Sequence, residues 1–228
     1  LPSDIRAFTS DRFLIYAAAG NIVYAYRGLR HVDFCLEGHK SPIVDILAFS
    51  DDFLASYDES GTLIVWNLQT RTQIKREEFP IDTFVVSAML HPSSYKNKLL
   101  LGSLQGPLRL WNFATGRSIY WFKGFDAAVS CLTQSPAKDV CAIGLNDGRI
   151  ILHNLRYDVS LVAVVQDGGA ITSIEFRSGN AWSRIIFYYR FHQLKVCIFL
   201  LRAIDVYTLI HSVRVLNERQ RDIVHVLR

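Results

Sequence analysis

The chain has 228 residues, of which 50% are apolar and 20% are charged, and a formal net charge of +4 at pH 7. This composition supports a packed core of one or two domains and excludes a highly charged disordered chain. The charge is uneven, because residues 1–178 carry 17 Lys/Arg against 18 Asp/Glu and residues 179–228 carry 8 against 3. The near-neutral first part therefore excludes an overall nucleic-acid-binding charge pattern there.

The cysteines and the absence of export signals bear on the compartment. Cys35, Cys131, Cys141 and Cys197 have no metal-ligand spacing, so we expect buried free thiols in a reducing compartment rather than disulfides or a metal site. The chain shows no glycosylation sequon, no signal peptide and no apolar run of 18 residues, which favours an intracellular, soluble protein. It begins with Leu1 rather than Met, so we expect it to be a fragment.

The predicted elements are short strands separated by turn residues. The apolar runs are rich in β-branched and aromatic residues and lack the 3.6-residue spacing of a helix. The Asp147-Gly148 pair between two such runs is a strong hairpin signal, because glycine accepts a positive φ. In chain order, strands are expected near 43–49, 53–57, 62–67, 128–132, 140–144, 149–153 and 170–177, and residues 17–26 are an earlier, weaker copy of the repeated pattern.

Three segments repeat a pattern at a nearly fixed period. Their closing pairs, Trp66-Asn67, Trp111-Asn112 and His153-Asn154, lie 45 and then 42 residues apart. A spacing of about 40 to 45 residues is typical of four-stranded propeller blades. We therefore predict an all-β fold, a partial β-propeller of about four blades over residues 1–178, followed by a tail that does not match.

The repeat that closes at Trp66 resembles a WD repeat with Asn in place of the final Asp. The resemblance implies a buried chain of hydrogen bonds in each blade, formed by a turn Asp, a strand Ser or Thr, a Gly-His histidine and the Trp indole. Buried polar groups of this kind need partners. This repeat has His39, Ser56 and Trp66, and Ser60 stands where the turn Asp is expected.

The later repeats depart further from the WD pattern. The second has Ser103 and Trp111, but Gln105 at the turn and no Gly-His; in the third, Phe125 replaces the histidine and His153 the tryptophan. The two tryptophans are interpreted as blade packing rather than ligand cages. Residues 120–125 are interpreted as packing between blades, with the alternative that one exposed aromatic residue there contacts a partner. The expected structural residues are His39, Ser56, Trp66, Ser103, Trp111, Asp147 and His153.

A narrower resemblance extends over roughly residues 1–178. The runs Gly38-His39-Lys40, 88–103, 108–112, 142–145, 151–155 and 171–177 resemble the nucleolar tandem-propeller family associated with U3 small nucleolar RNA. This resemblance implies a scaffold subunit of the UTP-B complex of the small-subunit processome, acting in pre-rRNA processing. The implied partners are other processome proteins, with indirect association to U3 RNA and pre-rRNA in the nucleolus.

Residues 179–228 do not continue the pattern. The run 185–202 is apolar but has no turn glycine, and Gly179 is the last glycine of the chain. It can be interpreted as a membrane segment, as a basic amphipathic helix that binds RNA or a membrane surface, or as an unselected tail from an unspliced intron or a shifted frame. The basic side chains Arg190, His192, Lys195 and Arg202 argue against a membrane segment.

Three classes of function follow from these patterns. The first is a non-catalytic scaffold, either in the processome or as a general WD-repeat interaction platform. The second is an enzyme, which the absence of a nucleophile elbow, a metalloprotease motif, a phosphate loop and a dinucleotide fingerprint disfavours. The third is direct RNA binding through scattered basic residues, which solvated surface charge explains as well. We expect no catalytic residue, cofactor, metal, membrane partner or small-molecule substrate.

Overall fold

The computed structural model describes residues 4–28, 31–165, 169–178, 183–191 and 193–201. These residues contain nineteen strands and no helix. The described part of the chain therefore contains no helix that could span a membrane. The strands form four sheets of four strands and a fifth sheet of three. The prediction of an all-β propeller of about four blades is therefore confirmed, with a further three-stranded sheet.

Each four-stranded sheet is one blade built from strands that follow one another in the chain. Blade 1 contains β1 (Ile5–Ser10), β2 (Ile15–Ala19), β3 (Ile22–Arg27) and β4 (His31–Glu37). Blade 2 contains β5 (Ile43–Phe49), β6 (Phe53–Asp58), β7 (Thr62–Asn67) and β8 (Thr72–Glu78). Blade 3 contains β9 (Val86–Leu90), β10 (Lys98–Ser103), β11 (Leu108–Asn112) and β12 (Arg117–Phe122). Blade 4 contains β13 (Val129–Gln134), β14 (Val140–Leu145), β15 (Arg149–Asn154) and β16 (Val159–Val165).

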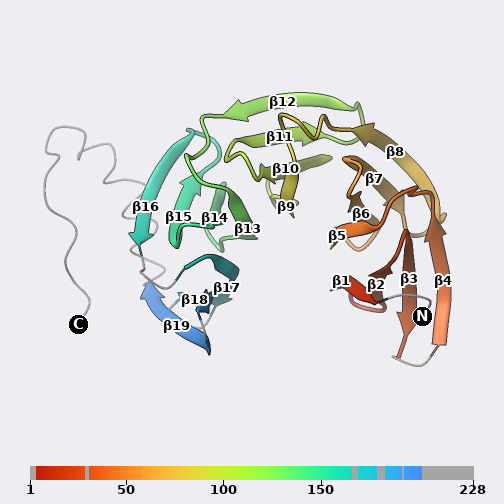
Figure 1. The fold of residues 1–228 in the computed structure, drawn as a ribbon, viewed down its shortest axis with the longest axis horizontal. Coiled ribbons are helices and arrows are strands. Elements are labelled where there is room, and N and C mark those ends of the chain that lie inside the picture. The colour runs from red at the N-terminus through yellow and green to blue at the C-terminus, as the bar shows by residue number, and fades with distance from the viewer. Residues whose placement is uncertain (1–3, 29–30, 166–168, 179–182, 192, 202–228) are drawn as a thin grey trace, which may run out of the picture.

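The blades follow one another along an arc. All neighbouring strands within a blade are antiparallel. The first strand of each blade lies toward the middle of the arc and the fourth lies on its outer rim (Figure 1). The arc is open between blade 1 and the fifth sheet (Figure 1).

Apolar side chains between neighbouring sheets form the core. Four clusters of buried residues each join two consecutive sheets, and this arrangement explains why an isolated repeat has no core of its own. Representative pairs, from the first interface to the last, are Ala18 with Leu54, Tyr57 with Leu99, Leu110 with Ile143, and Ala142 with Ile171.

Two glycines allow close approach between sheets. A Cβ atom at Gly102 would lie 2.6 Å from the Val129 side chain, and one at Gly144 would lie 2.7 Å from that of Ile171. A contact under 3.0 Å forces something to move, so a larger residue here would push the blades apart.

The fourth strand of blade 2 was not expected. No strand was expected between residues 67 and 128, but Lys75 and Arg76 lie within β8, and Arg71 precedes it. The strand is polar because it is the outermost of its sheet, and only its pairing with β7 marks it as a strand. An outer strand of this composition carries no alternating apolar signal for a sequence reading to detect.

The chain continues as strands beyond Ser178. The fifth sheet contains β17 (Ile171–Ser178), β18 (Ser183–Phe191) and β19 (Gln193–Leu201), in the order β17-β18-β19. The helix considered for this region is therefore wrong for residues 183–191 and 193–201. Short apolar runs fit a buried strand and a helix equally well, and pairing with β17 decides between them here. The rest of the expected tail, residues 202–228, lies outside the described residues.

Candidate functional site

A buried chain of four side chains crosses blade 2. The Trp66 indole N–H donates to Ser56 Oγ at 2.8 Å, and Ser56 Oγ lies 2.6 Å from His39 Nε2. His39 Nδ1 lies 2.7 Å from a carboxylate oxygen of Asp58. Because His39, Ser56 and Asp58 are 4%, 0% and 0% exposed, each needs these partners to avoid a large desolvation cost.

The donors and acceptors of this chain fix its protonation. Asp58 accepts from His39 Nδ1–H, which leaves Nε2 to accept from the Ser56 hydroxyl, whose oxygen in turn accepts from Trp66. Burial lowers the pKa of His39 despite the Asp58 carboxylate. Burial opposes ionisation of Asp58 as well, but hydrogen bonds from Ser60, His39 and the Thr62 N–H hold its pKa below the usual value. The pair is therefore neutral histidine with ionised aspartate near pH 7.

The turn Asp expected to be missing from blade 2 is present. Ser60 was assigned to that position, but the residue that bonds His39 is Asp58, two residues earlier. Ser60 supports it, because both its N–H and its hydroxyl donate to Asp58 Oδ1, at 3.0 and 2.6 Å. Counting back from the turn glycine misplaced the residue, since Asp58 is the last residue of β6 and not part of the loop.

Blade 3 lacks this chain although it has a serine and a tryptophan. The strand register pairs Leu54 with Trp66 in blade 2 and Leu99 with Trp111 in blade 3. Leu101 therefore takes the place of Ser56, and Ser103 takes the place of Asp58. The fully buried Trp111 N–H has no hydrogen-bond partner, since a leucine cannot accept.

The remaining polar residues of blade 3 bond locally. Ser103 donates to the Pro107 carbonyl at 2.9 Å, and Gln105 accepts from the Val85 N–H at 2.9 Å. Ser103 is thus the last residue of β10, and it closes its own hairpin rather than joining a chain through the blade.

Blade 4 uses its histidine in a different way. His153 takes the place of Trp66, because it pairs with Cys141 as Trp66 pairs with Leu54. Its ring nitrogens lie 3.1 Å from Asp158 and 3.4 Å from Ser160, and burial lowers its pKa. Asp147 is not part of this group; it forms an ion pair with Arg149 at 2.6 Å near the surface.

Other residues singled out from the sequence are not brought together. Among the described residues, no group of three or more His, Cys, Asp or Glu has the geometry to hold a metal ion. Cys141 is buried and Cys131 is half-buried, but Cys35 is exposed, which corrects the expectation of buried thiols for that residue. His91 follows β9 and stacks on Phe49, with 4.8 Å between ring centroids.

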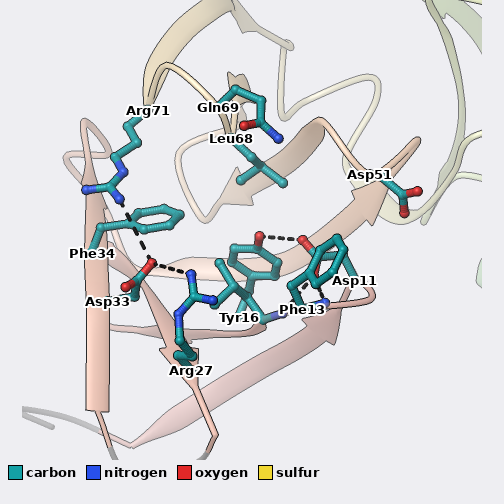
Figure 2. A pocket seen from close by; sticks show the side chains of 11 residues that line it. Asp11, Phe13, Tyr16, Arg27, Asp33, Phe34, Asp51, Leu68, Gln69 and Arg71 are labelled. Carbon is teal, nitrogen blue, oxygen red and sulfur yellow. Dashed lines mark hydrogen bonds and ion pairs between the residues drawn. The ribbon is translucent and has the colours of Figure 1, made fainter.

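A hollow of about 210 Å³ lies between blades 1 and 2 (Figure 2). Its walls include the aromatic rings of Phe13, Tyr16 and Phe34 and the charged side chains of Arg27 and Arg71. Sequence reasoning missed it, because its lining comes from loops and strand ends of two blades that share no motif. The full lining is Asp11, Phe13, Leu14, Tyr16, Arg27, Asp33, Phe34, Asp51, Leu68, Gln69 and Arg71.

The polar groups of the hollow bond to one another. The Tyr16 hydroxyl donates to Asp11 at 2.6 Å. Burial raises the pKa of Tyr16, and this hydrogen bond raises it further. Arg27 and Arg71 approach the same oxygen of Asp33, at 3.4 and 3.9 Å (Figure 2). Asp51 pairs with Arg12 outside the lining, so each charged side chain of the hollow has a partner in the described part of the chain.

The comparisons with known proteins identify the family. A family model described as "WDR36/Utp21 first beta-propeller" matches residues 1–218. The chain belongs to this family. The WDR36/Utp21 match extends through β17, β18 and β19, beyond the residues that carried the resemblance in the sequence.

Two curated relatives give the similarity in numbers. The chain is 40% identical over 178 residues to human WD repeat-containing protein 36, and 30% identical over 183 residues to the U3 small nucleolar RNA-associated protein 21 homolog of Schizosaccharomyces pombe. Each alignment covers 78% of this chain and 20% of the relative. The chain thus spans about a fifth of the length of these relatives.

Solved structures support the fold alone. The WD40 repeats of RRP9 match with a TM-score of 0.70 and 18% identity, covering 82% of this chain and 58% of theirs. The computationally designed Ika8 protein matches with a TM-score of 0.68 and 20% identity, covering 89% of this chain and 62% of its own.

Proposed function

We propose that the chain is a non-catalytic scaffold of the small-subunit processome, acting in pre-rRNA processing and small ribosomal subunit biogenesis. The observation that carries the proposal is membership of the WDR36/Utp21 family, together with relatives whose names associate them with U3 small nucleolar RNA. The proposed partners are other processome proteins, with indirect association to U3 RNA and pre-rRNA. The proposed location is the nucleolus.

The geometry of the polar groups supports a scaffold rather than an enzyme. The best-formed polar constellation, the chain from Asp58 to Trp66, is buried, and its hydrogen bonds are directed within the blade. A catalytic group must reach a substrate, and these side chains are almost entirely shielded from solvent. We therefore assign His39, Ser56, Trp66, Ser103, Trp111 and His153 to the interior of the blade framework. Asp147, also expected to be structural, is exposed and pairs with Arg149 at the surface of blade 4.

The test is co-purification of U3 small nucleolar RNA with tagged protein from nucleolar extract. Two versions are compared: the native chain, and a chain in which residues 179–228 are replaced by the corresponding sequence of a relative. We propose that residues 1–178 carry the function and that residues 179–228 are dispensable, so the replaced chain recovers at least as much U3 RNA. An unrelated small nuclear RNA is the control for specificity.

Each outcome decides a different part of the proposal. Recovery of U3 RNA by neither version, with both localised to the nucleolus, would contradict the processome assignment. Recovery by the native chain alone would show that residues 179–228 are a functional element. Binding of U3 RNA to the chain after all other proteins have been removed would make the chain a direct RNA-binding module rather than a scaffold.

A further inference from the structure

The outer strand of blade 3 differs in surface chemistry from that of blade 2. Ile119, Tyr120 and Trp121 on β12 are 48%, 47% and 51% exposed. The packing between blades expected for residues 120–125 therefore covers only part of Tyr120 and Trp121. Three consecutive half-exposed apolar residues on one strand are typical of an interaction surface rather than of a solvated face.

The strand register makes the comparison between blades direct. Val65 pairs with Lys75 and Ile64 with Arg76 in blade 2; in blade 3, Leu110 pairs with Tyr120 and Arg109 with Trp121. The places held by Lys75 and Arg76 on β8 are thus held by Tyr120 and Trp121 on β12. In the same way, Ile74 and Ile119 are equivalent, since each is the residue left out of the pairing at a bulge.

The free edge of β12 lacks the usual protection against strand pairing. In the sheet order β12-β11-β10-β9 the strand has one neighbour, and it lies on the outer rim of the arc (Figure 1). Outer strands are usually guarded by charged side chains, as β8 is by Lys75, Arg76, Glu77 and Glu78. The segment from Ser118 to Phe122 has no charged residue. The edge therefore presents backbone N–H and C=O groups beside apolar side chains.

Arg109, beside this edge, is positioned by two aromatic rings and one hydrogen bond. The guanidinium of Arg109 lies 5.0 Å from the centroid of the Phe79 ring and 4.9 Å from that of Trp121. Its Nε–H donates to Ser118 Oγ at 2.9 Å. Among the described residues, no carboxylate lies within 4.0 Å of this guanidinium. Glu77 on β8 interacts with it electrostatically from a greater distance, so the terminal N–H groups have no ion-pair partner in the described part of the chain.

Further positive charge lies at both ends of the strand. Arg117 begins β12 and Lys123 follows it; both are exposed, and neither forms an ion pair within the described part of the chain. The nearby carboxylate of Asp158 is already engaged by the Tyr120 hydroxyl at 3.0 Å and by His153 at 3.1 Å. The charge that would complement this rim is negative.

The corresponding edge of blade 4 lacks this combination. Its outer strand β16 is also poor in charge, but the arginine that pairs with it across the sheet, Arg149, is already bonded to Asp126 and Asp147. An uncharged edge with an unpaired, aromatic-flanked arginine distinguishes blade 3 from both neighbours.

We propose that the free edge of β12 docks an extended, acidic segment of a partner protein. The segment would add a strand to blade 3 by backbone hydrogen bonds, rest apolar side chains on Ile119 and Trp121, and place a carboxylate at the Arg109 guanidinium. A free strand edge matches a polypeptide better than RNA, because a nucleic acid has no backbone donors and acceptors at strand spacing. The inference is independent of the processome assignment, since it rests on the edge alone.

The experiment selects peptides from a displayed library of random twelve-residue sequences on the full chain, with counter-selection on the Ile119→Lys variant. The best peptide is then synthesised and its affinity measured by fluorescence anisotropy. Ile74→Lys is the matched control, because it introduces the same charge at the equivalent bulge of blade 2. The same peptide N-methylated at alternate residues tests strand pairing without changing the protein.

The expected result is enrichment of acidic peptides with alternating apolar residues. Affinity should fall at least tenfold in Ile119→Lys, at least fivefold in Arg109→Gln and at least tenfold on N-methylation, and should change less than twofold in Ile74→Lys. Absence of enrichment, enrichment of basic peptides, or equal binding of the N-methylated peptide would overturn the proposal. If Ile119→Lys does not fold by circular dichroism, Arg109→Gln and the N-methylated peptide decide the outcome.

Discussion

Replacement of two buried serines by alanine tests the hydrogen-bond chain of blade 2. Ser56 and Ser103 are each 0% exposed and lie on the second strands of consecutive blades, so the change in volume is the same. They differ in the partners they serve. Ser56 bonds the side chains of Trp66 and His39, whereas Ser103 bonds only the Pro107 carbonyl.

The difference in cost follows from the groups left unpaired. Ser56→Ala leaves the Trp66 N–H and His39 Nε2 buried without partners, at about 1–3 kcal/mol each. In Ser103→Ala the Pro107 carbonyl keeps a second donor, the Ser103 N–H at 3.2 Å, so only one hydrogen bond worth about 0.5–1.5 kcal/mol is lost. We expect Ser56→Ala to lower the free energy of unfolding by about 2–4 kcal/mol more than Ser103→Ala does.

The assay is urea unfolding of the two variants and the unmodified chain, followed by tryptophan fluorescence at submicromolar concentration. Midpoint and slope are both fitted, so that a change in compactness is not mistaken for a change in stability. Equal costs within about 0.5 kcal/mol, near the limit of such a comparison, would refute the reasoning. They would mean that the buried partners of Ser56 find water or other acceptors once the hydroxyl is removed.

Three further predictions concern the core, pH and the open arc. Trp66→Ala and Trp111→Ala should each lower the free energy of unfolding by roughly 3–5 kcal/mol, as large core truncations do; unchanged thermal unfolding of either would contradict its placement in the core. Partial burial raises the pKa of Asp45 from its usual value to about 6, so Asp45→Asn should stabilise the chain at pH 7, where the half-buried carboxylate is ionised, and lose this advantage as the pH falls from 6 to 4; a urea midpoint gain that is the same at pH 7 and at pH 4 would argue against it. The chain alone should associate or aggregate in size exclusion, since the open arc leaves a face of blade 1 without a neighbouring sheet (Figure 1), and a sharp monomer peak with cooperative melting would count against this.

The blade framework was predictable because each repeat carries its own signals. The expected strand 43–49 has the bounds of β5, and the expected strands 53–57 and 62–67 agree with β6 and β7 to within one residue. Alternating apolar residues and turn glycines are local features, so they can be read without knowledge of the partner blades. The outer strand β8 was not predicted, because few of its side chains are buried and because its pairing with β7, not its composition, makes it a strand.

The details of the polar residues could not be read in the same way. Whether Asp58 or Ser60 faces His39 depends on where β6 ends, because Asp58 is the last residue of the strand and Ser60 lies in the turn that follows. The assignment of Ser103 failed for the same reason, because the register and not the residue type sets its position. The half-exposure of Trp121 depends on how far Phe84 covers it, at 5.3 Å between ring centroids. That distance is a property of two blades together.

The hydrogen-bond chain of blade 2 couples the effects of mutations at its four positions on the free energy of unfolding. Loss of Ser56 removes the partner of Trp66 and His39 at once, so a later change at either position has little left to break. The costs of successive replacements should therefore be far from additive, in contrast to distant sites. Blade 3 shows what a blade without this hydrogen-bond chain looks like: an apolar Leu101 and a Trp111 without a hydrogen-bond partner are both buried in the core. Blade 2 is thus the part of the arc where sequence is most constrained by chemistry, and its neighbours are freer to exchange polar residues for apolar ones.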